Sequence, residues 1–147
     1  MRTVISPWDP EIMLRCLIVD DTAQFLIAAR GLLERQGISV VGVAWNSAEA
    51  LEQVVELQPD VTLVDIDLGG ESGFELARKL VDESRPASPR VILISTHAEG
   101  DYADLIAASP AVGFLSKSAV SAGAILALLR NDGDSERVDP VSGPRGS

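Results

Sequence analysis

The sequence has little of what several common classes of protein need. Its single cysteine, Cys16, cannot form an internal disulfide, and a thiolate metal site needs several sulfur ligands. Because Cys16 lies in an apolar run, we interpret it as a small core residue. No apolar segment approaches the roughly 20 residues that a membrane-spanning helix requires, and the N-terminus lacks the apolar stretch of a secretory signal. These absences predict a cytoplasmic protein.

Basic residues are also scarce. Twelve lysines and arginines stand against 22 acidic residues, which gives a formal net charge of −10. This balance disfavours nonspecific binding to nucleic acid or to an anionic membrane surface. We therefore expect no direct nucleic-acid binding by this chain and no membrane partner.

What the sequence does contain is a regular alternation of two patterns. Short apolar runs rich in Val, Ile and Leu are typical of strands buried on both faces. There are five of them: Cys16–Val19, Val40–Ala44, Val61–Val64, Val91–Ile94 and Val112–Leu115. Between these runs and after the last of them, apolar spacing and the capping pair Asn46 and Glu49 predict helices over residues 25–33, 47–57, 73–83, 101–108 and 119–130. This alternation predicts an α/β fold, a doubly wound five-stranded parallel sheet with five helices.

The length allows one domain with its own core. We expect residues 1–12 to be an N-terminal extension and residues 13–131 to form the domain. Residues 132–147 are polar and rich in Gly, Pro and Ser, which predicts a disordered tail. The stretch after Arg130 is too short for a winged or three-helix DNA-binding unit. The chain is therefore either a stand-alone domain or one part of a longer protein.

Acidic and polar residues follow four of the predicted strands: Asp20 and Asp21, then Asp65, then Ser95 and Thr96, then Lys117. In an open parallel sheet, groups at the carboxyl ends of the strands gather at one edge. Neighbouring carboxylates repel each other, and a hard divalent cation such as Mg²⁺ relieves this repulsion. With a lysine and a hydroxyl nearby, the set predicts Mg²⁺-dependent phosphoryl transfer onto an aspartate.

These residues, together with Phe114 and the segment LGGESGF at residues 68–74, resemble the pattern of the receiver domain of bacterial two-component response regulators. The resemblance covers about residues 13–131 and implies a flavodoxin-like sheet with strand order 2-1-3-4-5. It implies that a cognate histidine kinase phosphorylates Asp65. It also implies that Asp21 binds Mg²⁺ directly and that Asp20 binds it mainly through water.

The same resemblance implies the remaining roles. The backbone carbonyl of Asp67 completes the metal ligands. Because this position borders the path of attacking water in the family, we hypothesise that the Asp67 side chain tunes dephosphorylation. Lys117, Ser95 and Thr96 stabilise the phosphoryl group, and Ser95 and Phe114 switch with it. The output is a population shift at the face of the fourth helix, fifth strand and fifth helix, for a homodimer or a protein partner. Such a domain is a phosphoacceptor and not an enzyme, beyond slow self-dephosphorylation.

One residue departs from the family pattern. Ser118 stands where the family usually has a proline after the active-site lysine. A cis peptide before a residue other than proline costs about 2.5–4 kcal/mol. Either Ser118 takes the cis form under constraint or the loop differs locally, and both leave the placement of Lys117 open.

Two other functions stay open. A pseudo-receiver would keep the fold, escape phosphorylation and act as a protein-binding module. A phosphatase of the haloacid dehalogenase type also uses an Asp-x-Asp pair after a strand, although there the nucleophile strand comes first. Of the other residues, His97 is expected in an exposed loop. The abundance of Leu and Ala in residues 119–130 predicts that a partner or a second copy covers this helix.

Overall fold

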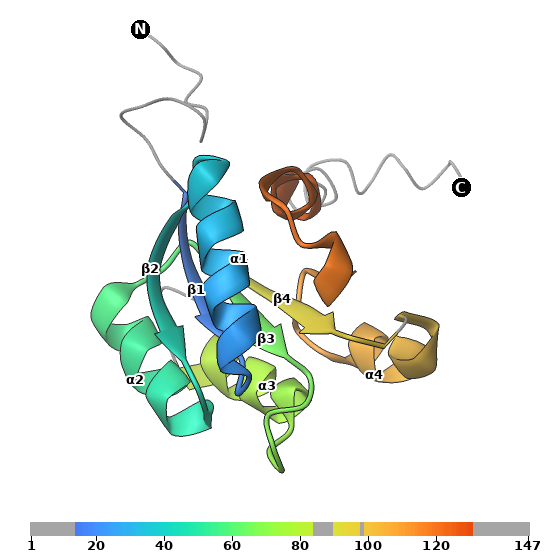
Figure 1. The fold of residues 1–147 in the computed structure, drawn as a ribbon. Coiled ribbons are helices and arrows are strands. Elements are labelled where there is room, and N and C mark those ends of the chain that lie inside the picture. The colour runs from blue at the N-terminus through green and yellow to red at the C-terminus, as the bar shows by residue number, and fades with distance from the viewer. Residues whose placement is uncertain (1–13, 84–89, 98, 131–147) are drawn as a thin grey trace, which may run out of the picture.

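The structure, a computed structural model, describes residues 14–83, 90–97 and 99–130. Within these ranges one parallel sheet has the strand order β2-β1-β3-β4-β5 (Figure 1), which confirms the predicted fold class and order. The strands are β1 (Arg15–Val19), β2 (Ser39–Ala44), β3 (Val61–Asp65), β4 (Arg90–Ser95) and β5 (Gly113–Ser116). The predicted extension at residues 1–12 and tail at residues 132–147 lie outside the described residues.

Helices cover both faces of the sheet (Figure 1). They are α1 (Ala23–Arg35), α2 (Ser47–Leu57), α3 (Gly73–Glu83), α4 (Ala103–Ala108) and a C-terminal helix described over residues 122–130. Side chains of α1 and the C-terminal helix share one core cluster with the strands, and α2 and α3 share a second. None of the helices in the described ranges combines the length and hydropathy that crossing a membrane would need.

The start of α2 follows the predicted capping pair. The Asn46 side chain accepts a hydrogen bond from the Glu49 backbone N–H at 2.9 Å. The Glu49 carboxylate reaches back to the backbone N–H of Trp45 at 2.8 Å. Glu71, from the loop after β3, accepts from the Ser47 N–H at 2.9 Å. The loop that follows the Asp65 strand is thereby tied to the N-terminus of α2.

Two helices begin later than the sequence predicts. Residues 99–102 form a 3₁₀ turn before α4, and Lys117–Ala119 form a second 3₁₀ turn. The C-terminal helix begins only at residue 122, where the Gln36 side chain accepts the Ala122 N–H at 2.6 Å. Ser121 Oγ accepts the Ala124 N–H at 3.0 Å. These caps set the start of the helix, and Gln36 comes from the distant end of α1.

The C-terminal helix has less apolar surface than the sequence predicts. Ile125, Leu126 and Leu129 are all buried, and the Leu128 side chain lies against Gly113 of β5. The exposed positions within residues 122–130 are Gly123 and Arg130. Most leucines of this helix therefore pack in the core, and few remain for contact with a partner.

Candidate functional site

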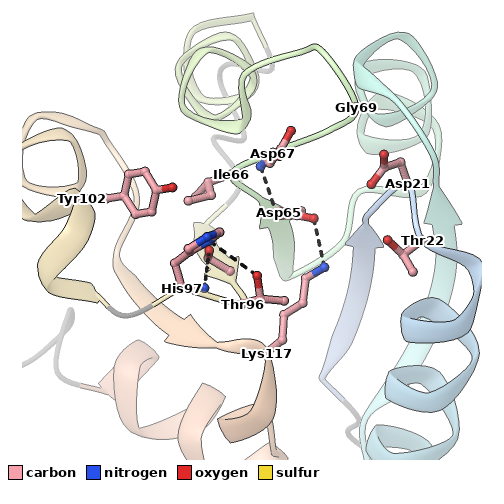
Figure 2. Close-up of a pocket in the computed structure, with 11 residues that line it drawn as sticks. Asp21, Thr22, Asp65, Ile66, Asp67, Gly69, Thr96, His97, Tyr102 and Lys117 are labelled. Carbon is pink, nitrogen blue, oxygen red and sulfur yellow. Dashed lines mark hydrogen bonds and ion pairs between the residues drawn. The ribbon is translucent and has the colours of Figure 1, made fainter.

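The side chains predicted from the sequence meet at the carboxyl ends of the strands. A cavity of about 240 Å³ opens there, lined by Asp21, Thr22, Asp65, Ile66, Asp67, Gly69, Ser95, Thr96, His97, Tyr102 and Lys117. Figure 2 shows Asp21 and Thr22 on one side of Asp65, and His97 and Tyr102 on the other. Asp20, Asp65 and Ser95 are buried, whereas Asp21 is exposed.

Lys117 joins the two buried carboxylates. Its Nζ lies 2.6 Å from Asp20 Oδ2 and 3.0 Å from Asp65 Oδ2, and the Lys117 side chain is 13% exposed. Burial by itself lowers the pKa of Lys117, but hydrogen bonds to the two carboxylates outweigh it and hold the pKa above its usual value. The lysine is therefore a fixed cation beside Asp65. The sequence left the placement of Lys117 open because Ser118 replaces the usual proline. In the structure the Lys117 ammonium lies beside Asp20 and Asp65.

Asp65 ends β3 at the floor of the cavity and is 5% exposed. Its Oδ1 accepts the Asp67 backbone N–H at 3.1 Å, while its Oδ2 faces Lys117. Burial raises the pKa of Asp65, and the nearby charge of Asp20 adds to the rise. The Asp67 N–H and Lys117 oppose this change without cancelling it. A buried carboxylate with a cation beside it and open space in front is well placed to act as a nucleophile.

Three carboxylates lie close enough to share one cation. Oxygen atoms of Asp20, Asp21 and Asp65 all lie within 4.8 Å of one another. Asp20 Oδ1 accepts the Thr22 N–H at 2.8 Å, and the buried Oδ2 has no hydrogen-bond donor besides Lys117 in the described part of the chain. An all-oxygen set with one exposed member suits a hard divalent ion that keeps some of its water. The residues present therefore fit Mg²⁺.

Two glycines, Gly69 and Gly73, allow the backbone after β3 to pass close to Asp21 and Asp65. A Cβ at Gly73 would overlap the carbonyl oxygen of Asp65, so only glycine lets α3 begin against β3. Gly69 has a φ of 63° and lies in the loop between β3 and α3, where an added Cβ would come within 2.6 Å of Asp21 Oδ2. This loop passes directly over the acidic cluster.

The two hydroxyls after β4 have different surroundings. Ser95 is buried, and its Oγ accepts the His97 backbone N–H at 2.9 Å. Thr96 is exposed at the cavity, with Oγ1 3.5 Å from Nδ1 of His97. His97 is exposed, as predicted, but it also lines the cavity, where its ring packs edge-on against Tyr102 at 5.9 Å between centroids. Phe114 of β5 is half-buried against the core cluster of α2 and α3.

Sequence reasoning missed three residues of the site. Thr22 and Tyr102 both line the cavity, and Phe25 lies under the lysine, with Nζ of Lys117 4.8 Å from its ring centroid. Thr22 directly follows Asp20 and Asp21 in the sequence, so its place at the site could have been predicted. Phe25 and Tyr102 look like ordinary apolar positions of helices, and only the packing of those helices brings them to the strand ends.

Comparisons with known proteins agree with this geometry. Residues 16–130 match the family described as the response regulator receiver domain. A protein-glutamate methylesterase/protein-glutamine glutaminase of Myxococcus xanthus is 40% identical over 98 residues, which are 66% of this chain and 26% of that protein. The signal receiver domain of the putative response regulator NarL from Mycobacterium tuberculosis superposes with a TM-score of 0.69 at 30% identity, covering 82% of this chain and 96% of that one.

A third similar protein is a response regulator from Burkholderia pseudomallei, whose structure contains a phosphorylated aspartic acid, a calcium ion and citrate. It has a TM-score of 0.68 at 26% identity, and the match covers 88% of this chain and 74% of that one. The chain belongs to the response regulator receiver domain family of two-component systems. It spans between 26% and 58% of the length of eight curated relatives, which include methylesterases and transcriptional regulators.

Proposed function

We propose that Asp65 accepts a phosphoryl group from a cognate histidine kinase, and that the modified domain then binds its partner differently. The observation that carries this proposal is the Asp65 carboxylate, which is buried, faces an open cavity and contacts the Lys117 ammonium at 3.0 Å. The Burkholderia pseudomallei relative with its phosphorylated aspartic acid supports the same chemistry.

The transfer itself is a substitution at phosphorus. A carboxylate oxygen of Asp65 forms the new P–O bond, the bond from phosphorus to the donor nitrogen breaks, and the donor imidazole leaves with that electron pair. Lys117 balances the negative charge on the phosphoryl oxygens, because its ammonium already contacts the acceptor carboxylate. The Ser95 and Thr96 hydroxyls donate to the same oxygens, for which Ser95 turns from the His97 N–H that it now accepts.

Asp20, Asp21 and Asp65, with the backbone carbonyl of Asp67, would hold the Mg²⁺. When bound, the ion neutralises part of the charge on the carboxylates and on the incoming phosphoryl group. Asp21, the exposed member of the cluster, would serve as a direct ligand, and Asp20 would contribute mainly through water. The structure of the phosphorylated relative contains a calcium ion, which supports binding of a divalent cation by a domain of this family.

The output face consists of α4, β5 and the C-terminal helix. In our proposal Phe114 moves with Ser95, and the face then binds a second copy or another protein. Support comes from packing: α4 has no buried residue, all of β5 is half-buried, and Leu105 of α4 is 52% exposed. The chain serves as a stand-alone receiver in the cytoplasm or as the receiver part of a longer regulator, without direct contact to nucleic acid. It turns over no substrate beyond its own slow dephosphorylation.

The test is to incubate the protein with Mg²⁺ and acetyl phosphate and to record its intact mass. One phosphoryl adduct is expected on wild type, and none on Asp65→Asn. Asp60→Asn is the matched control, because Asp60 lies at the other end of β3 and its carboxylate accepts the Arg15 N–H, which an amide oxygen can also do. An Asp65→Asn protein with a full adduct would contradict the proposal. Absence of an adduct on every variant would favour the pseudo-receiver, and turnover of small phosphoesters would favour the phosphatase.

A further inference from the structure

We infer that Phe25 is a positioning residue for Lys117: the face of its ring supports the ammonium group while the carboxylate partners of the lysine change during phosphorylation. This inference rests on the proposed function, since it concerns how Lys117 is held at the acceptor site. Phe25 belongs to α1, so this contact comes from a different element than the loop that carries Lys117.

The geometry is that of a cation over an aromatic face. Nζ of Lys117 lies 4.8 Å from the centroid of the Phe25 ring, inside the roughly 6 Å range in which the ring quadrupole attracts a cation. The lysine side chain is 13% exposed, and Phe25 is half-buried against the core cluster of α1 and the C-terminal helix. Water therefore screens this contact only in part, which strengthens it.

The backbone around Lys117 is less buried than the core-facing side of α1. All four residues of β5 are half-buried, and Ser118 and Ala119 in the following 3₁₀ turn are exposed. The Ser118 hydroxyl lies 3.3 Å from that of Ser116. Phe25 belongs to α1, a 13-residue helix whose Leu26, Ala29 and Leu33 are buried in the core. Phe25, on the well-buried helix α1, therefore contacts the ammonium end of the Lys117 side chain, whose backbone lies in a less buried segment.

The ring contact is also the one that phosphorylation can leave in place. Two of the three contacts of the ammonium in the described part of the chain are to Asp20 Oδ2 and Asp65 Oδ2. In the proposed function Asp65 becomes an acyl phosphate, and Asp20 would help to hold Mg²⁺, mainly through water. An aromatic face attracts a cation without a fixed direction, so the ammonium can shift from carboxylate to phosphoryl oxygen and stay over the ring.

The test compares Phe25→Leu, which keeps an apolar side chain and removes the aromatic face, with Phe25→Tyr, which keeps that face. Phosphorylation by acetyl phosphate is followed by intact mass. Because this donor is a small molecule, the rate does not depend on any role of α1 in binding a histidine kinase. We expect Phe25→Leu to form the adduct roughly two- to tenfold more slowly and Phe25→Tyr to keep the wild-type rate. In a Lys117→Met background, Phe25→Leu should have no further effect.

A second measurement does not depend on phosphorylation. The NMR resonances of the Lys117 Cε protons should be shifted upfield by the ring in wild type and in Phe25→Tyr, and should return toward ordinary lysine values in Phe25→Leu. Equal adduct rates in Phe25→Leu and wild type would overturn the inference. It would also be overturned if Phe25→Leu slowed adduct formation in the Lys117→Met background as much as it does in wild type. If wild type forms no adduct, the proposed function fails instead, and the Lys117 resonances alone then decide whether the ring holds the ammonium.

Discussion

The two sides of the site are packed differently. On one side, β1 leads into Asp20, β3 ends at Asp65 and β4 ends at Ser95, and these strands are buried along nearly their whole length. On the other side, β5 is half-buried throughout and α4 has no buried residue. This difference indicates that the tightly packed strands hold the site residues in place, whereas the loosely packed face can change its conformation.

The largest effect is expected on the tightly packed side. A Gly73→Ala substitution places a methyl group on the Asp65 carbonyl oxygen, so α3 or β3 must shift. We expect it to lower the free energy of unfolding by about 3 kcal/mol or more, measured by urea denaturation. The matched control is Gly123→Ala in the C-terminal helix, where a Cβ meets no atom within 4 Å and alanine should stabilise by up to about 1 kcal/mol. Equal effects of the two substitutions would contradict the comparison.

The next effect concerns metal binding. Mg²⁺ should raise the melting temperature of the wild-type protein, because an ion that binds only the folded state stabilises it. An Asp21→Asn substitution should weaken Mg²⁺ affinity about tenfold or more, measured by titration calorimetry, with little change in melting temperature without the ion. Asp82→Asn, an exposed aspartate on α3, serves as the control and should bind as wild type does. Unchanged affinity in Asp21→Asn would place the ion elsewhere.

The third effect follows from the raised pKa of Asp65, whose main cause is burial. An acid with a raised pKa binds its proton more readily in the folded state, so its contribution to stability is lost as pH rises from the unfolded pKa through the folded pKa. Without Mg²⁺, Asp65→Asn should therefore unfold at higher urea concentration than wild type at pH 7. The difference should vanish below the ordinary aspartate pKa of about 4. A gain that persists in acid would show that charge is not its cause.

The smallest effect is expected at the rim. The Asp67 side chain is exposed and lines the cavity, where it can orient a water molecule that attacks the phosphoryl group. Asp67→Asn should lengthen the lifetime of phosphorylated Asp65 severalfold, followed by the decay of the intact-mass adduct after the donor is removed. A lifetime equal to that of wild type would exclude a role of Asp67 in dephosphorylation.

The sequence predicted the tightly packed side better than the loose one. Uninterrupted apolar runs before Asp20 and Asp65 identify buried strands, and a carboxylate at the end of such a run is costly to bury unless a cation balances it. The late start of the C-terminal helix was not predictable, because the cap on Ala122 comes from Gln36, the residue that follows α1. The contact of Phe25 with Lys117 likewise depends on how α1 lies against the sheet, which periodicity does not specify.

The measurement that tests the proposed switch most directly is hydrogen exchange by mass spectrometry, with Mg²⁺ present throughout, before and after addition of acetyl phosphate. We predict that exchange changes in α4 and β5 and stays the same in β1 and β3, and that Asp65→Asn shows no change anywhere. The same change in Asp65→Asn as in wild type, or a change confined to β1 and β3, would contradict the switch.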